Sequence, residues 1–280
     1  MSHHDKESVL ARDLQALNEQ KMNRRRMFTW MATATAVPVL GGLLKSNLLK
    51  AQVANLPINQ GGVTPPTAAT CSVIPPETAG PYPGDGSNGA NALGLSGIVR
   101  SDITTSVGTA SGVAAGIPLR VELTLINAAG NCEPLVDYAV YIWHCDQIGD
   151  YSMYTGAAKT ENYLRGVLAS DAEGVVAFDS IFPGCYAGRW PHIHFEVYKS
   201  IETATTYRGK VATSQLALPP VPCKDVYATA GYEKSVRNLA NISLARDNVF
   251  SDGVTLQLAS VTGSVELGYV AKLTVAIKGS

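Results

Sequence analysis

A series of short runs in which apolar and polar residues alternate places the strongest constraint on the fold of this chain. Side chains along a β-strand point to opposite faces in turn, so alternation is typical of a strand with one buried face. Short strands at this spacing predict an all-β sandwich of antiparallel strands, with long loops and short helical segments. The expected strands are 95–99, 118–126, 139–145, 175–181, 192–198, 254–258 and 271–277, and only 222–248 has a weakly helical pattern.

The length and composition fit one globular domain preceded by a separate N-terminal segment. The chain has 280 residues, of which 46% are apolar and 16% are charged. This composition is ample for one sizeable core. The formal net charge is -1, so nothing in the charge balance indicates nucleic acid or an anionic membrane as a partner.

The N-terminal segment has the pattern of an export signal. Three consecutive arginines at 24–26 precede an uncharged apolar stretch at 30–44. This stretch is shorter than the roughly 20 residues that a membrane-spanning helix needs. A basic segment before a short apolar one is typical of a secretory signal, and the paired arginines followed two positions later by Phe28 fit the twin-arginine type.

We therefore divide the chain into a helical export leader (1–50), a linker rich in Pro and Gly (51–70) and one domain (71–280). This division predicts the twin-arginine export machinery as a partner and a periplasmic or extracellular location. No clean Ala-x-Ala cleavage site occurs at 51–54, so a retained leader that anchors the protein to the membrane stays open. The alternative is a cytoplasmic chain with an N-terminal anchoring helix.

The cysteines are dispersed and contain no CxxC pair, so neither a zinc ribbon nor an iron–sulfur cluster is predicted. In an exported protein they predict one or two disulfides, and the odd number leaves at least one cysteine unpaired. The connectivity stays open at this point. The five residues are Cys71, Cys132, Cys145, Cys185 and Cys223.

A His-x-His pair at His192 and His194 is the sharpest local indication of a functional site. Residues i and i+2 of a strand project from the same face, so the two imidazoles would emerge together, as paired metal ligands must. Ile193 between them would point into the core. The pair alone is equally compatible with two histidines on a strand surface. His144, which follows Trp143 at a strand end, is expected to support the site or the core and not to bind metal.

Two tyrosines in nearby loops strengthen the case for a metal. Tyr186 lies in a turn just before the histidines, and Tyr151 follows the end of an earlier strand. A free phenol, with a pKa of about 10, is a poor ligand at neutral pH, but a trivalent metal lowers that pKa and suits the hard phenolate oxygen. Two Tyr and two His therefore favour Fe(III) over zinc. Taken alone, either tyrosine would be a packing residue.

Several motifs occur in a fixed order along the chain: a stretch at 136–146 that ends in Trp-His-Cys-Asp, then Gly149-Asp-Tyr151, Phe182-Pro-Gly-Cys-Tyr186 and Arg189-Trp-Pro-His-Ile-His-Phe195. Earlier, Glu77-Thr-Ala-Gly-Pro-Tyr82 has the form Glu-x-x-Gly-Pro-Tyr. In these motifs the chain resembles the intradiol ring-cleavage dioxygenases, and most closely the protocatechuate 3,4-dioxygenase type. The resemblance extends from about residue 71 to the C-terminus.

The resemblance implies one non-haem Fe(III) per site, held by Tyr151, Tyr186, His192 and His194. In that family the tyrosine of the Pro-Gly-x-Tyr turn is the axial ligand, which leaves the metal when a catechol chelates it. This role falls on Tyr186, whereas Tyr151 would stay bound. His192 matches the axial histidine of the family and His194 the equatorial one.

Three further residues acquire roles from the same resemblance. Arg189, three positions before the first histidine, would stabilise negative charge that develops on the substrate. Gln215, on a later strand, matches a glutamine that lies beside the metal site in the family. Tyr82 would line the substrate pocket. The departing Tyr186 would accept a substrate proton and so act as a general base.

The implied activity is that of an oxidoreductase of aromatic catabolism. A catechol would be cleaved by O2 between its two hydroxyl-bearing carbons to give a muconate-type diacid. The chain departs from the family pattern around the tyrosine turn, at Cys185, Ala187-Gly188 and Trp190-Pro191, and its spacing from Tyr186 to His192 is short. These positions concern the pocket walls, so the choice of catechol stays open, as does the oligomeric state, a homo-oligomer included.

Two other functions fit the same residues. One is an exported β-sandwich that stores or senses a metal without turnover. The other is a structural or carrier domain similar to the transthyretin-like sandwiches, with the tyrosines and histidines as surface features. The colour of an Fe(III)–phenolate protein and its uptake of oxygen distinguish these functions from a dioxygenase.

Overall fold

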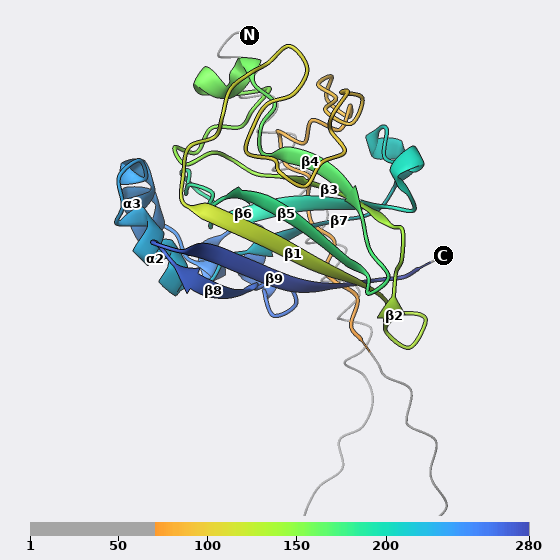
Figure 1. The fold of residues 1–280 in the computed structure, drawn as a ribbon. Coiled ribbons are helices and arrows are strands. Elements are labelled where there is room, and N and C mark those ends of the chain that lie inside the picture. Colours follow the sequence, from red (N-terminus) through yellow and green to blue (C-terminus); the bar gives the residue numbers. More distant parts are fainter. Residues whose placement is uncertain (1–70, 280) are drawn as a thin grey trace, which may run out of the picture. The chain divides into compact units, whose positions relative to one another are not determined.

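The structure is a computed structural model that describes residues 71–279. The predicted leader at 1–50, with its twin-arginine run, and the linker at 51–70 lie outside the described residues. Within the described range, no helix is long and apolar enough to cross a membrane. The strands of this range form two sheets (Figure 1): β1 (Pro118–Asn127), β2 (Glu133–Pro134), β3 (Ala139–Trp143), β4 (Arg165–Ala169), β5 (Val175–Ile181), β6 (His192–Tyr198), β7 (Lys210–Ala217), β8 (Ser260–Ser264) and β9 (Gly268–Ile277).

The first sheet has the order β2-β1-β9-β8, and β5 pairs with the other side of β1. Alternation along β1 explains its place: Leu119, Val121 and Leu123 are at most 1% exposed, whereas Arg120 and Glu122 between them face outward. The pairing of β1 with β9 is parallel, and the other pairings are antiparallel. The expectation of purely antiparallel strands is therefore wrong at this one pair, because the alternating pattern of a strand carries no information on the direction of its neighbour.

The second sheet, β4-β3-β6-β7, is antiparallel throughout and is buried on both faces. Every residue of β3 and β6 is buried. One face of β6 presents Ile193, Phe195 and Val197 to the main core, where they meet side chains of the first sheet such as Val121 and Leu123. The opposite face carries polar and aromatic residues that are covered by loops. This buried polar face is where the functional residues lie.

Strand register aligns four residues of the covered face in one row across the second sheet. Trp143 of β3 pairs with Arg165 of β4 on one side and with His194 of β6 on the other. His194 in turn pairs with Gln215 of β7. Residues far apart in the chain thus become immediate neighbours around His194.

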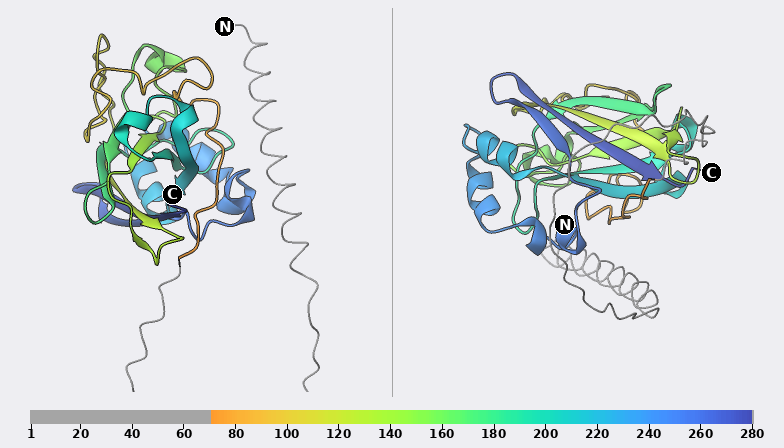
Figure 2. Two further views of the ribbon diagram at one scale, coloured as in Figure 1. Left: turned by 90° about the vertical axis from the view of Figure 1, so that its right-hand side faces the viewer. Right: turned by 90° about the horizontal axis from the view of Figure 1, so that it is seen from below.

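The remaining secondary structure consists of short helices. Within the described range, two α-helices, α2 and α3, coincide with the weakly helical region 222–248, although α2 begins two residues before it, and they lie at one end of the sheets (Figures 1 and 2). Pro220 opens α2 at a position where its missing N–H costs nothing. The helices are α2 (Pro220–Tyr227), α3 (Glu233–Ala240) and the 3-10 turns Gly156–Thr160, Ile201–Thr203, Tyr207–Gly209, Leu244–Arg246 and Phe250–Asp252.

Two expected strands are wrong. Residues 95–99 and 254–258 form turns and bends, and each contributes only an isolated bridge, Val99 to Val167 and Leu258 to Ala217. These segments are loops that cover the sheets. Such a loop needs apolar side chains on its inner side, just as an edge strand does, and this explains the alternation. Four strands lie outside the alternating runs, β2, β4, β7 and β8, and their sequences are short or rich in small and polar residues. Of these, only β7 was expected, because the resemblance placed Gln215 on a later strand.

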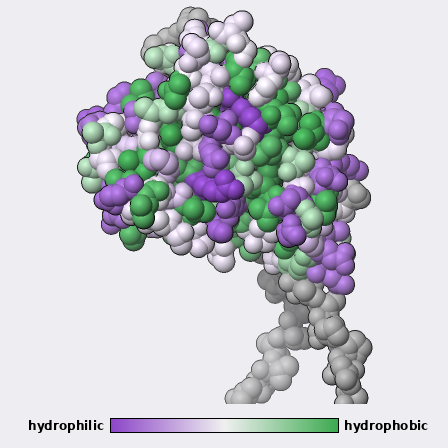
Figure 3. Space-filling model, in the orientation of Figure 1, coloured by the Kyte–Doolittle hydropathy of each residue, from purple (hydrophilic) through white to green (hydrophobic). Residues whose placement is uncertain are grey.

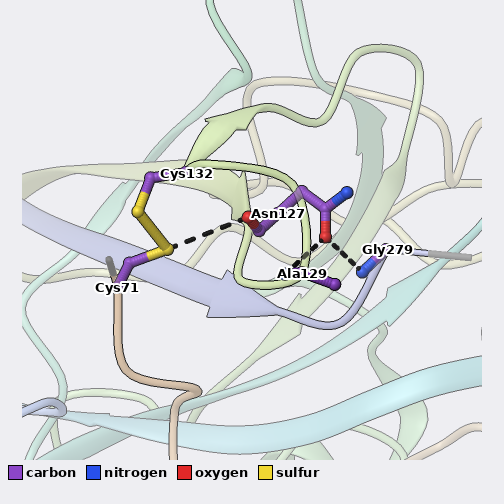
Figure 4. Close-up of a disulfide and its surroundings, with 5 residues drawn as sticks. All are labelled: Cys71, Asn127, Ala129, Cys132 and Gly279. Carbon is purple, nitrogen blue, oxygen red and sulfur yellow. Dashed lines mark hydrogen bonds between the residues drawn. A yellow bond between two sulfur atoms is a disulfide. The ribbon is translucent and has the colours of Figure 1, made fainter. Parts of the chain in front are cut away.

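A disulfide links Cys71 to Cys132, which follows the end of β1, as Figure 4 shows. The loop that it closes spans 61 positions, a length for which the chain-entropy model gives about 4 kcal/mol of stabilisation. The side-chain oxygen of Asn127 accepts hydrogen bonds from the N–H groups of Ala129 and Gly279, each 3.0 Å long. The start and the end of the described chain are therefore both tied to the end of β1.

The outer face of the first sheet is solvated. Arg120 forms ion pairs with Glu122 at 3.0 Å and with Asp179 at 2.8 Å, and Lys272 pairs with Glu122 at 2.7 Å. The face of the molecule seen in Figure 3 correspondingly shows hydrophilic residues across its middle, with hydrophobic residues interspersed. The buried polar groups of the second sheet, by contrast, are hidden from this side.

Candidate metal centre

Four side chains that the sequence singled out converge on one point. The Nε2 atoms of His192 and His194 lie 3.1 Å apart. The Tyr186 oxygen is 3.2 Å from His192 Nε2, and the Tyr151 oxygen is 3.5 Å from both His192 Nε2 and the Tyr186 oxygen. Two phenol oxygens and two imidazole nitrogens therefore surround a single small volume.

Strand β6 orients the two histidines. Their i and i+2 positions place both rings on the covered face, while Ile193 is fully buried in the core. His192 Nδ1 donates to the carbonyl of Trp190 over 2.5 Å, which leaves the lone pair of Nε2 free to face the site. The ring of His194 stacks on the indole of Trp143, with centroids 4.9 Å apart and planes 5° from parallel.

Two loops bring the tyrosines to these histidines. Tyr151 lies in the loop that follows β3, and Tyr186 lies in the loop between β5 and β6. The loops touch at Gly149, whose φ is +91° and where a Cβ atom would stand 3.1 Å from the Cβ of Tyr186. Glycine suits this position because the backbone is left-handed and the approach is close. Tyr82, from the N-terminal loop, packs on Tyr151 with ring centroids 5.0 Å apart.

The protonation states follow from burial. Burial lowers the pKa of His192 and of His194 well below the ordinary value, and the charge of Arg189 lowers both further. Both imidazoles are therefore neutral at pH 7. Burial raises the pKa of Tyr186 to about 12 and that of Tyr151 well above its ordinary value. The site without a cation thus holds two neutral phenols and two neutral imidazoles.

These residues fit a single metal ion. Bonds of about 2.0 to 2.2 Å to N and O ligands place neighbouring donor atoms about 3 to 3.5 Å apart, and the donor atoms here have that spacing. Among residues 71–279, no group of three or more His, Cys, Asp or Glu side chains is arranged to hold a metal. At this centre two phenols stand beside the two imidazoles, and phenolate oxygen favours a hard trivalent cation over zinc.

Arg189 lies beside this centre in a fixed orientation. Its Nε donates to Asp247 over 2.9 Å, and a terminal nitrogen donates to the Gln215 side-chain oxygen over 2.6 Å. Gln215 in turn donates to the carbonyl of Thr78 over 2.9 Å. The structure thus brings together the two residues that the resemblance paired with the site, and β7 supplies Gln215 as expected.

Asp247 is a residue of this centre that sequence reasoning missed. It is fully buried and accepts hydrogen bonds from Arg189 and from the backbone N–H groups of Trp190, Val249 and Phe250. Its carboxylate therefore links the loop before β6 to the last 3-10 turn. The chain offers no local indication of this role, because Asp247 lies 58 residues from Arg189 in an unremarkable polar segment.

Arg165 is a second residue that was missed. It is fully buried, and its guanidinium donates to five oxygen atoms rather than to a carboxylate. Two are main-chain carbonyls of Tyr82 and Pro83, and one is the hydroxyl of Tyr141. The other two belong to Ser152, at 3.0 Å for the hydroxyl and 2.9 Å for the carbonyl. Arg165 therefore clamps together the two segments that carry Tyr82 and Tyr151.

A pocket of about 510 Å³ opens onto the centre. This volume lies in the range of small-molecule sites in proteins. Tyr151, Tyr186 and Arg189 form part of its wall, so a small molecule in the pocket would lie beside the centre. Tyr82 also lines it, as the resemblance implied. The other lining residues are Thr78, Pro81, Gly149, Asp150, Thr155, Ala187, Gly188, Asn248 and Val249.

His144 and the three free cysteines do not line the pocket. His144 is buried, its Nδ1 bonding the carbonyl of Cys145 and its Nε2 the hydroxyl of Ser180, both at 2.7 Å. This agrees with the expected core role. Cys145, Cys185 and Cys223 are buried free thiols. Cys185 is thus neither a disulfide partner nor a pocket thiol, although it lies next to Tyr186, because its side chain turns towards the carbonyl of Arg189.

His144 makes stability depend on pH. Burial lowers its pKa from 6.5 to about 4, so the unfolded chain binds more protons than the fold between these values. The free energy of unfolding contributed by the neutral ring is present above pH 6.5 and is lost as pH falls towards 4. We expect His144→Gln to remove about 2.5 kcal/mol of the stability loss between pH 7 and pH 4.5. Urea unfolding of both proteins at the two pH values measures this, and an equal loss in both would contradict it.

Comparisons with known proteins bear on this architecture. A family model described as "Dioxygenase" matches residues 99–192, a range that contains Tyr151, Tyr186 and His192. It spans about a third of the chain. No curated protein matches the sequence.

Solved structures extend the likeness to most of the chain. The intradiol ring-cleavage dioxygenase from Tetranychus urticae is 23% identical, with a TM-score of 0.58 over 74% of this chain and 95% of its own. A second dioxygenase structure is 23% identical, with a TM-score of 0.57 over 74% and 94%. The dioxygenase domain of a dioxygenase carbohydrate-binding protein fusion from Streptomyces sp. SirexAA-E is 21% identical, with a TM-score of 0.47 over 75% and 100%. The first two similarities show that the described residues have an intradiol dioxygenase-like fold.

Proposed function

We propose that residues 71–279 form the catalytic domain of a non-haem Fe(III) dioxygenase that cleaves catechols in the intradiol position. The observation that carries this proposal is the convergence of Tyr151, Tyr186, His192 and His194 beside a pocket. Four donors of this kind would hold one Fe(III). The dioxygenase-like fold supports the same reaction class.

The metal, when bound, and Tyr186 would have different roles: the metal would activate the catechol, and Tyr186 would accept a proton from it. When bound, Fe(III) supplies Lewis acidity that lowers the pKa values of the catechol hydroxyls and draws electron density from the ring. Tyr186 borders the pocket, and its oxygen would be a phenolate when the metal is bound, so it could accept a proton from one catechol hydroxyl as the substrate enters. Tyr151 is fully enclosed at 2% exposure and is suited to a permanent role.

Arg189 supplies a fixed positive charge. Its guanidinium borders the pocket and is held by Asp247 and Gln215, so little reorganisation is needed during the reaction. It stabilises the negative charge that develops on the substrate as the electron-rich ring reacts with O2. Gln215 is a positioning residue in this scheme, because it orients Arg189 and is itself anchored to Thr78.

The overall reaction is balanced without an external electron donor. The bond between the two hydroxyl-bearing carbons breaks, and both atoms of O2 enter the product, a muconate-type diacid. The chain's contribution is to bind the catechol in one orientation and to shield it from water.

We also propose that the twin-arginine machinery exports the protein to the periplasm or beyond. The arginines at 24–26 and the apolar stretch after them support this proposal. The Cys71–Cys132 disulfide supports it independently, since disulfides persist in oxidising compartments. Cell fractionation with an antibody to the catalytic domain checks the location.

Iron loading combined with oxygen uptake tests the proposed reaction. Protein loaded with Fe(III) should contain one iron per chain, show a red to burgundy colour, change colour with catechol and consume one O2 per catechol. A preparation that stays colourless and inert after iron loading would refute the proposal. Coloured protein that binds catechol without oxygen uptake would instead indicate a metal-binding module.

A further inference from the structure

The charged residues of the pocket wall limit the substituents that a substrate can carry. Among the described residues that line the pocket, Arg189 is the cation and Asp150 the anion. The guanidinium of Arg189 is engaged with Asp247, a buried carboxylate, at 2.9 Å. The positive charge of Arg189 is therefore held beside Tyr186 and Tyr151 by a paired carboxylate, whereas no ion pair joins Asp150 to a residue of the described range. Asp150 therefore brings an acidic side chain without an ion-pair partner in the described range to the pocket lining.

Asp150 is held in place by its surroundings. Its carboxylate accepts a hydrogen bond from the hydroxyl of Thr155 over 2.9 Å, and that hydroxyl accepts the N–H of Tyr151 over 2.8 Å. The N–H of Asp150 donates to Asp146 over 2.9 Å. On the other side the carboxylate lies against Gly156, where an added Cβ would collide with it. The negative charge is thus fixed at the pocket wall and cannot swing away.

The position of Asp150 relates it directly to the substrate ring. It immediately precedes Tyr151, which belongs to the four-donor centre, and it shares the pocket wall with Gly149 and Tyr186. A catechol whose hydroxyls face the centre has its ring in the pocket, and about 510 Å³ leaves room for substituents on that ring. A carboxylate on the ring would approach Asp150, with like charges in a partly buried site, and Arg189, the cation among the described lining residues, is already paired with Asp247.

We propose that Asp150 is a specificity-determining residue that makes this pocket select catechols with neutral or cationic substituents and reject those with a carboxylate. This inference rests on the proposed function of the site. It predicts that this chain rejects protocatechuate. That carboxylated catechol is the substrate of the enzymes that the motifs of the chain most resemble.

A substrate series with a charge-removing variant tests the inference. The probes are 4-methylcatechol, 4-(2-aminoethyl)catechol and protocatechuate, which differ in the charge of one substituent. The wild-type protein should use the first two with kcat/KM about tenfold or more above that for protocatechuate. Asp150→Asn should raise the ratio of protocatechuate to 4-methylcatechol about tenfold, which is the effect expected of one like-charge contact in a partly buried site. Asp225→Asn removes the same charge from the exposed side of α2 and should leave the ratio unchanged.

Two further measurements test the inference even if the protein does not turn over or the variant does not fold. Calorimetric Kd values for 4-methylcatechol and protocatechuate, measured without oxygen, report the same preference even if no variant turns over. If Asp150→Asn does not fold, the wild-type preference should still weaken between low and high salt, since screening acts on the repulsion. A wild-type preference for protocatechuate, or a ratio unchanged in Asp150→Asn, would overturn the inference. Lack of turnover of every catechol, with the binding preference intact, would overturn the proposed reaction alone.

Discussion

Replacement of His194 by alanine is expected to abolish iron binding. The side chain supplies one of the four donor atoms, 3.1 Å from its neighbour on His192, and its ring is fixed by stacking on Trp143. Loss of a residue that merely orients a ligand typically costs 10- to 100-fold in metal affinity, so loss of the ligand itself should cost more than about 100-fold. Metal analysis of the loaded and dialysed protein measures the iron content, and the visible absorbance reports the phenolate bond.

Tyr151→Phe should have the same effect on iron, because it removes the more deeply buried phenol while preserving the packing on Tyr82. His144→Gln is the matched control, since that histidine is buried but bonds only to Cys145 and Ser180. It should retain one iron per chain. Full iron content in His194→Ala, with the visible band intact, would show that the metal does not use this histidine.

Replacement of Arg189 by alanine is expected to separate metal binding from turnover. Iron and colour should be retained, because no donor atom is removed. The kcat should fall by about 10²- to 10³-fold, the loss typical of deleting one preorganised charge-stabilising group. The fold should survive, because three backbone N–H groups still satisfy the buried Asp247 after its ion pair is lost.

Arg246→Ala is the control for Arg189→Ala. It removes an exposed arginine at the end of the 3-10 turn Leu244–Arg246, immediately before Asp247, and should leave kcat unchanged. Iron content, the visible spectrum and steady-state oxygen uptake are compared in the three proteins. Normal turnover in Arg189→Ala would refute the role assigned to the guanidinium. Loss of iron in that variant would assign it to the assembly of the metal centre instead.

The local sequence pattern predicted most of the strands, but it did not predict which strands pair with each other. The run 175–181 coincides with β5 and 192–198 with β6, because alternation or a fully apolar face is a property of consecutive residues. The same pattern at 95–99 belongs to a loop. Sheet order and the parallel pairing of β1 with β9 arise from contacts between segments about 150 residues apart, on which local sequence carries no information.

The residues of the candidate site also fall into two groups: those that the sequence motifs identified and those that only the structure revealed. Motifs with a fixed order identified Tyr151, Tyr186, His192, His194 and Arg189, and the structure brings all five together. Sequence analysis did not identify Asp247 or Arg165, because their roles depend on tertiary contacts and not on their neighbours in the sequence. Each anchors two segments that are far apart in the sequence, 58 residues for Asp247 and Arg189 and 83 for Arg165 and Tyr82.

Sequence alone was enough to place five of the nine described strands and to identify the kind of atoms offered to a metal. Strand periodicity places His192 and His194 on one face, and the chemistry of two phenols and two imidazoles favours Fe(III). The tertiary structure was needed to show that the four donor atoms meet, that Arg189 is held by Asp247 and Gln215, and that Asp150 lines the pocket. The physical reason is that such distances depend on strand register and loop packing across the whole domain, which are set by many weak contacts acting together.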